Sequence, residues 1–281
     1  MNWWEAIVLG IVEGFTEYLP VSSTGHLILT QRMLGIEQTE ASDSYAVCIQ
    51  AGAIIAVVGL YWRRIRDMLI GIGCKLTGRE SDGHGFQLAV NIIVAFLPAA
   101  VIGLLFDDMI EAMLFGLWPI VFAWFVGGVA ILAVAWWRRG HRGEAKELPL
   151  ENLSWKMALA IGTIQCIAMW PGTSRSLVTI VGGVMVGLSL TAAVEFSFLL
   201  GVLTLLAATV YKAKDAGPVM VEAYGWWPMI VGSIAAWVSA VIAVKWMVNY
   251  LKRHGMQLFG YYRVGLAIVV AICLVLGWLP S

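Results

Sequence analysis

The sequence predicts an all-α integral membrane protein made of two inverted repeats, each combining a re-entrant helical hairpin with three transmembrane helices. Hydrophobic residues make up 60% of the 281 residues and charged residues only 13%, with a mean hydropathy of +0.83. This apolar share is well above that of soluble domains. The formal net charge is zero, so the composition does not favour nucleic acid as a partner. The four cysteines stand singly, without the spacing of metal ligands or of a disulfide framework.

Six stretches are long enough to cross a bilayer, which requires about 20 apolar residues. They cover roughly residues 46–62, 88–106, 117–137, 191–211, 226–244 and 258–279. Four further apolar segments, about 3–19, 27–35, 157–170 and 177–188, are too short to cross and come in two pairs. Each pair is interrupted by a polar turn with a proline, YLPVSSTGH in the first and WPGTSRS in the second. This pattern indicates re-entrant hairpins, whose irregular backbone is tolerated at membrane depth only where protein or a wet cavity surrounds it.

The order of the segments divides a single membrane domain, 1–281, into two repeats. Repeat one covers about 1–137, a cytoplasmic linker about 138–153 and repeat two about 154–281. Each repeat holds an odd number of spans, so the second enters the membrane inverted, and the site is expected where the two broken segments meet. The excess of Lys and Arg in the linker marks the cytoplasmic side. We expect no removable signal peptide, because the N-terminus lacks a basic region and a small-residue cleavage site.

Two carboxylates precede the first turn. Glu13 and Glu17 are four residues apart and therefore share one face of a helix. A carboxylate at membrane depth is costly and by default indicates function, although two carboxylates at a helix end near the headgroups would also account for the pair. Because carboxylates are hard oxygen ligands, the pair predicts a site for a divalent cation, Mg²⁺ or Ca²⁺.

The first turn itself is rich in hydroxyl groups. Ser22, Ser23 and Thr24 fall where the next helix should begin, so any one of them could simply be an N-cap. Three in a row, at a helix end with free backbone N–H groups, predict a site for an anion such as phosphate. His26 follows within one helical turn, where a lone histidine is as often a hydrogen-bonded core residue as a chemical group.

The second turn supplies a permanent cation. Arg175 lies inside an apolar hairpin with no acidic neighbour in the sequence. It could snorkel to the interface, but it lies at the tip of the hairpin, far from either interface, so we expect it to bind phosphate. Ser174, Ser176 and Thr179 repeat the hydroxyl pattern at a helix start and are predicted to bind the same phosphate.

Three polar side chains within the apolar segments are predicted to support the two turns. Glu195 lies inside a span, in AVEFSFLL, and is expected either to pair with Arg175 or to support the hairpin. Gln50 holds a comparable place in the first half, and Gln165 precedes the second turn as Glu13 precedes the first. Each of the three could also serve only as structural hydrogen-bonding groups between helices.

The segments EGFTEYLPVSSTGH, IQAGAI and PGTSRS, together with AVEFSFLL, closely resemble the undecaprenyl pyrophosphate phosphatase family of the bacitracin-resistance type, along nearly the whole chain. The resemblance implies an enzyme that removes the terminal phosphate from the C55 isoprenoid diphosphate carrier, which is then reused for peptidoglycan and other envelope polymers. It also implies the inverted-repeat fold and a site that opens to the outer side of the bacterial plasma membrane. The functional residues of the family fall here on Glu13, Glu17, Ser22, Ser23, His26, Ser174, Arg175 and Thr179.

These residues lead to a hypothesis for the reaction. Arg175 clamps the diphosphate, Glu13 and Glu17 hold the cation, and Ser23 attacks the terminal phosphorus while His26 or Glu17 accepts the serine proton. Direct attack by His26 and attack by water are the alternatives to Ser23 as the nucleophile. The rival function is a polyprenyl-phosphate transporter, because inverted repeats with broken helices are also a transporter architecture. The sequence leaves the oligomeric state open, a homodimer being one option.

Overall fold

The residues that the structure describes form helices joined by turns and loops. The computed structural model describes residues 1–79, 83–114, 116–140 and 147–279. Within these ranges the extended pairing is limited to an isolated bridge between Leu148 and Leu188. The helices are α1 Trp3–Thr16, α2 Ser23–Met33, α3 Glu40–Leu60, α4 Trp62–Thr77, α5 His84–Leu114, α6 Leu117–Gly140, η1 Leu150–Asn152, α7 Trp155–Gln165, η2 Cys166–Met169, α8 Arg175–Met185, α9 Leu190–Tyr224, α10 Trp226–His254 and α11 Gln257–Val275.

Six helices in the described part of the chain are long and apolar enough to cross a membrane, which confirms the predicted spans. They are α3, α5, α6, α9, α10 and α11. The four short apolar segments are also helices, α1, α2, α7 and α8, and each is shorter than the roughly 20 residues that a span requires. The protein is therefore an all-α, multi-pass membrane protein.

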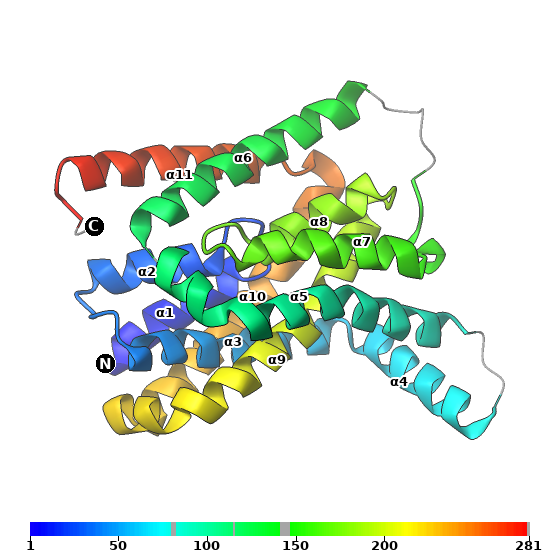
Figure 1. Ribbon diagram of the computed structural model, residues 1–281, viewed down its shortest axis with the longest axis horizontal. Coiled ribbons are helices and arrows are strands. Elements are labelled where there is room, and N and C mark those ends of the chain that lie inside the picture. Colours follow the sequence, from blue (N-terminus) through cyan, green and yellow to red (C-terminus); the bar gives the residue numbers. More distant parts are fainter. Residues whose placement is uncertain (80–82, 115, 141–146, 280–281) are drawn as a thin grey trace.

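The short helices pack against longer helices of the bundle (Figure 1). Helix α3 packs on both α9 and α10, and α6 packs on α11 along one edge. The first helix of each short pair contacts a long helix from the other half of the chain, since α1 packs on α10 and α7 packs on α5. These contacts bring the turn after α1 and the turn before α8 into the same region.

Small residues allow this close packing. A Cβ atom added at Gly14 of α1 would overlap the carbonyl oxygen of Ala236 and the hydroxyl of Ser239 in α10. A Cβ atom at Gly162 of α7 would overlap the carbonyl oxygen of Ala95 in α5. Small residues at helix interfaces let the backbones approach closely, so these glycines allow α1 to pack on α10 and α7 on α5.

Helix α4 has no counterpart among the predicted elements. Basic residues such as Arg66 and Lys75 stand between apolar residues such as Leu69 and Leu76. The helix therefore contains no apolar run long enough to cross a membrane. It ends at Gly78, whose φ of 69° is the left-handed conformation common after helices. In Figure 1 α4 projects from the bundle beside the start of α5. Residues 141–146 of the predicted linker lie outside the described residues.

Candidate active site

Each of the two turns ends in a serine with the same unusual backbone. Ser22 is the N-cap of α2 with φ 73° and ψ 103°, and Ser174 is the N-cap of α8 with φ 76° and ψ 112°. In the described part of the chain these are the two non-glycine residues with positive φ. Such backbone costs about 1–3 kcal/mol per residue and is typical of functional sites. Both hydroxyls accept a backbone N–H, from Gly25 at 3.4 Å and from Leu177 at 3.3 Å, so both serines are caps.

Glu17 joins the two turns. Its Oε1 accepts a hydrogen bond from Nη2 of Arg175 at 2.9 Å, and its Oε2 accepts one from the hydroxyl of Ser23 at 2.5 Å. Nη1 of Arg175 donates to the carbonyl oxygen of Ser197 at 2.9 Å, and the guanidinium lies 5.4 Å from the ring centre of Tyr18. The structure therefore places the predicted nucleophile, a carboxylate and the predicted phosphate clamp in one buried cluster.

Glu13 lies fully buried beside this cluster. Neither of its carboxylate oxygens has a hydrogen-bond partner among the described residues, and the same holds for the amide of Gln165 and for Nε of Arg175. Buried polar atoms are almost always hydrogen-bonded, so these atoms indicate that a ligand completes the site.

The carboxylates fit a divalent cation only with help from a ligand. Within the described ranges there is no group of three or more His, Cys, Asp and Glu side chains that could hold a metal ion. Glu13 and Glu17 provide two carboxylates one helical turn apart. Mg²⁺ is commonly bound by one or two carboxylates together with phosphate oxygens and water, so the pair fits this cation in the presence of a phosphate ligand.

His26 faces away from Ser23. Its Nδ1 lies 2.6 Å from the carbonyl oxygen of Ser22, and its Nε2 lies 2.8 Å from the hydroxyl of Tyr262 in α11. A carbonyl oxygen only accepts, so Nδ1 carries the proton and Nε2 accepts from Tyr262. The Tyr262 ring also stacks on the imidazole, with the ring centres 5.8 Å apart and an angle of 9° between the ring planes. The hydroxyl of Ser23 is bonded to Glu17, so the geometry favours Glu17 over His26 as the group that receives the serine proton.

The remaining predicted hydroxyls mostly hold the turns together. Ser176 donates to the carbonyl oxygen of Leu19 at 2.8 Å and so links the second turn to the first. Thr179 donates to the carbonyl oxygen of Arg175 at 2.8 Å and contacts the hydroxyl of Ser197 at 2.6 Å. Thr24 is half-buried in the first turn of α2.

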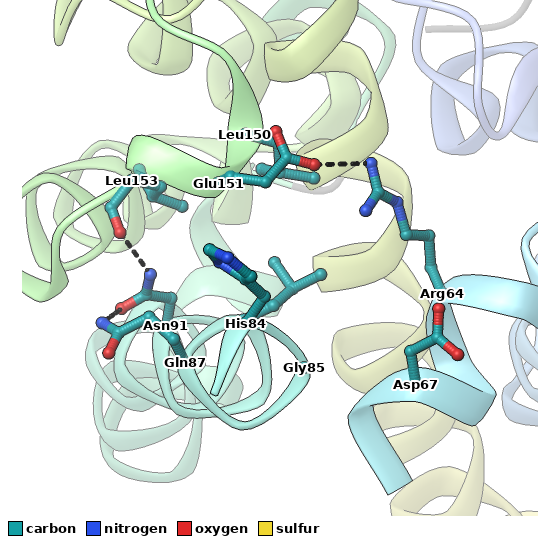
Figure 2. A pocket seen from close by; sticks show the side chains of 10 residues that line it. Arg64, Asp67, His84, Gly85, Gln87, Asn91, Leu150, Glu151 and Leu153 are labelled. Atoms are coloured by element: carbon teal, nitrogen blue, oxygen red, sulfur yellow. Dashed lines mark hydrogen bonds and ion pairs between the residues drawn. The ribbon is translucent and has the colours of Figure 1, made fainter. Parts of the chain in front are cut away.

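Of the two roles predicted for Glu195, pairing with Arg175 is wrong, and support of the hairpin stays a prediction. Nε of Arg64 donates to Glu195 at 2.6 Å, and Nη2 of Arg64 donates to Glu151 at 2.9 Å. Arg64 and Glu151 line a cavity of about 230 Å³ together with residues of α5. Figure 2 shows the bond between the two side chains. The pKa of Glu151 lies below its ordinary value, because its own backbone N–H and Arg64 both bond to the carboxylate. Gln50 lies half-buried on α3 and has no hydrogen bond to the Glu17 cluster in the ranges described.

Comparison with known proteins places this architecture in a family. Residues 6–269 match the family model described as "Bacitracin resistance protein BacA". The chain belongs to this family. A protein of Sorangium cellulosum named undecaprenyl-diphosphatase is 43% identical over 271 residues, covering 96% of this chain and 86% of its own. Proteins of the same name in Aquifex aeolicus and, as "Undecaprenyl-diphosphatase 2", in Rhodospirillum rubrum are each 40% identical, covering 96% and 95% of this chain and 98% and 93% of their own.

In this member of the bacitracin resistance family a cavity of about 430 Å³ adjoins the cluster. Arg175 and Gln165 contribute to its wall, and the other lining residues are mostly apolar and come from α5, η2 and α9, among them Phe96, Met169 and Leu205. An apolar cavity with a few polar groups in its wall is the usual form of a site for a small molecule or lipid.

Two residues of α11 were missed by the sequence analysis. Arg263 is 0% exposed and donates to four backbone carbonyl oxygens, and Tyr262 holds His26. The signal that could have identified Arg263 is a charge inside the apolar span 258–279, the same signal that singled out Glu195. Tyr262 gives no such signal, because tyrosine is common near the ends of membrane helices.

Proposed function

We propose that this protein is an undecaprenyl-diphosphatase, which hydrolyses the C55 isoprenyl diphosphate to the monophosphate and inorganic phosphate. The observation that carries the proposal is the bonding of Glu17 to both Ser23 and Arg175, which joins a nucleophile, a base and a phosphate-binding cation. The names of relatives that are similar over nearly the whole chain support the same reaction. In the cell the reaction returns the lipid carrier as the monophosphate for envelope synthesis. This supply of monophosphate is the basis of bacitracin resistance.

Ser23 attacks the terminal phosphorus while its proton passes to Glu17. The new Oγ–P bond forms as the bond from phosphorus to the bridging oxygen breaks, and the isoprenyl monophosphate leaves. Water then cleaves the phosphoserine, and inorganic phosphate is released. Arg175 has five N–H donors, of which Glu17 and Ser197 take two, so donors remain for the oxygens of the diphosphate.

The backbone of the two turns completes the phosphate site. The first N–H groups of α2 and α8 lie at helix N-termini, where anions are stabilised. Ser22 and Ser174 hold the positive-φ backbone that presents these groups, and Ser176 and Thr179 support it. A divalent cation bound by Glu13 and Glu17, Mg²⁺ or Ca²⁺, would neutralise charge on the diphosphate.

The isoprenyl units nearest the diphosphate fit the apolar cavity beside Arg175. The diphosphate would be held at Arg175 and the Ser23 turn, and the chain would lie along Phe96, Met169 and Leu205. Arg175 and Gln165 offer polar groups to the headgroup, and the mostly apolar remainder of the wall suits the chain.

We place the protein in the bacterial plasma membrane as two inverted repeats with the site open to the outer side. Two observations support the repeats. Ser22 and Ser174 share one rare backbone conformation at matching positions, and the first short helix of each half packs on a long helix of the other, α1 on α10 and α7 on α5. Lys and Arg in the linker support the orientation.

Phosphate release from undecaprenyl diphosphate by the purified protein in detergent tests the proposal. A hydrolase releases phosphate with no second compartment present, whereas a polyprenyl-phosphate transporter leaves the lipid chemically unchanged. We expect release that stops when the divalent cation is chelated. Binding of the lipid without any phosphate release, at saturating lipid and cation, would support the transporter.

A further inference from the structure

Arg263 is a buried cation to which the proposed reaction gives no role. It is 0% exposed, and among the described residues no carboxylate forms an ion pair with it. A buried guanidinium is costly to desolvate unless hydrogen bonds compensate, and a charge inside a membrane span indicates function by default.

All its hydrogen bonds go to backbone carbonyl oxygens. Nε donates to Trp124 at 3.3 Å and Nη2 donates to Ala123 at 2.9 Å, and both acceptors belong to α6. Nη1 donates to Pro20 at 3.3 Å, in the first turn, and Nη2 also donates to Gly172 at 2.9 Å, in the second turn. One guanidinium therefore fastens both turns to the same helix.

The carbonyl groups of Pro20 and Gly172 lie the same number of residues before the reacting side chains of their turns. Ser23 is three residues after Pro20, and Arg175 is three residues after Gly172. Each interval includes one of the positive-φ serines, so both short segments have a constrained backbone. A displacement of either carbonyl at Arg263 is therefore transmitted to Ser23 or to Arg175.

Other contacts show that α6 supports both turns. The indole N–H of Trp124 donates to the carbonyl oxygen of Val21 at 3.0 Å. The indole N–H of Trp170, beside the second turn, donates to the carbonyl oxygen of Pro119 at 3.2 Å. Gly172 lies so close to α6 that an added Cβ atom would be 2.9 Å from Cα of Ile120. Arg263 completes this support from the α11 side.

We infer that Arg263 is a positioning residue, whose guanidinium holds the two turns at the separation at which Ser23, Glu17 and Arg175 meet. It touches neither the nucleophile nor the clamp. The expected effect of Arg263 on turnover rests on the proposed function. The expected effect of Arg263 on the distance between the two turns does not. Because a misplacement of about 1 Å can cost about 10²-fold in rate, loosening the turns should lower kcat more than it weakens lipid binding.

Two variants disturb Arg263 in different ways. Arg263→Lys keeps the charge but replaces a planar fork of five donors by an ammonium with three, so it cannot reach all four carbonyls. Gly127→Ala keeps the arginine intact and displaces it, because a Cβ atom at Gly127 would overlap Nη2. Gly265→Ala in α11 is the matched control, since a Cβ atom there meets nothing within 4 Å.

The first readout is the steady-state kinetics of each folded, purified variant on undecaprenyl diphosphate. We expect Arg263→Lys and Gly127→Ala to lower kcat at least about tenfold with a much smaller change in KM, and Gly265→Ala to match the wild type. If both variants lose only folded yield or thermal stability and keep the wild-type kcat, Arg263 is a structural residue only and the inference is wrong.

The second readout does not depend on activity. Spin labels are placed at Phe15, at the end of α1, and at Ile167, in η2, both exposed, in a background without the four native cysteines. We expect the distance distribution between them to shift or widen in Arg263→Lys and Gly127→Ala and to stay unchanged in Gly265→Ala. An unchanged distribution in both variants overturns the inference, even if the wild type proves to release no phosphate.

Discussion

The hydroxyl of Ser23 donates a 2.5 Å hydrogen bond to the same carboxylate, Glu17, that accepts from Arg175 at 2.9 Å. Ser23 and Glu17 come from the two sides of the first turn, and Arg175 comes from the second. A serine at its ordinary pKa is a weak nucleophile and needs a base within hydrogen-bond reach. Glu17 meets that requirement, and its bond to Arg175 places the base beside the group that would bind the phosphate.

Replacing Glu17 by Gln should lower kcat at least about 10²-fold, because the amide cannot accept the serine proton. The side chain keeps its size, so the protein should remain folded. Glu195→Gln is the matched control, since Glu195 bonds to Arg64 and not to the cluster, and we expect near-normal turnover. Phosphate release at saturating lipid measures both variants. Near-normal turnover in Glu17→Gln would remove Glu17 from the chemistry.

Gly201→Ala should lower turnover by displacing Arg175. A Cβ atom at Gly201 would overlap Nη1 of Arg175, so the guanidinium must leave Glu17 or Ser197. We expect kcat to fall about ten- to 10²-fold, the scale of a misplaced clamp. Gly59→Ala, where a Cβ atom meets nothing within 4 Å, should have no effect. Equal kinetics for the two alanine variants would show that the position of Arg175 does not matter.

Tyr262→Phe should have a small but measurable effect. The variant keeps the ring that stacks on His26 and removes only the hydrogen bond to Nε2. One such bond contributes about 0.5–1.5 kcal/mol. Because His26 also bonds to the carbonyl oxygen of Ser22 in the first turn, we expect kcat to fall about three- to tenfold. Tyr261→Phe is the control, because the Tyr261 side chain is 66% exposed. A decrease of 10³-fold or more would instead indicate that Tyr262 takes part in proton transfer.

Chelation of divalent cations should abolish phosphate release, and added Mg²⁺ or Ca²⁺ should restore it. In Glu13→Gln the cation concentration for half-maximal activity should rise at least about tenfold, because one of two oxygen ligands is weakened. A titration of activity against free cation measures this. If chelation leaves the wild type fully active, the unpaired carboxylate of Glu13 serves another purpose, such as binding a proton.

The sequence was sufficient for the spans and for the residues of the two turns. Length and apolarity decide whether a helix can cross a bilayer, so the six spans and the four short helices could be located without knowing their contacts. Charges at membrane depth are costly, which is why Glu17 and Arg175 stood out. Helix α4 was missed because its basic residues interrupt the apolar run.

Which partners these charges choose could not be predicted. Pairing of Arg175 with Glu17 and of Glu195 with Arg64 depends on how the helices cross, and the sequence gives no crossing angles. The same limit applies to Arg263, whose four acceptors are backbone carbonyls that any residue supplies. The orientation of His26 follows from Tyr262, 236 residues away along the chain.

The most direct test of the account is to trap the phosphorylated enzyme during turnover of lipid labelled on its terminal phosphorus. A phosphoserine survives acid, whereas a phosphohistidine does not. We expect acid-stable label on the peptide that contains Ser23, and no such label in Ser23→Ala or Glu17→Gln. Label that survives only alkaline quenching and maps to His26, or no label under any quench while phosphate is released, would contradict the role of Ser23 as nucleophile.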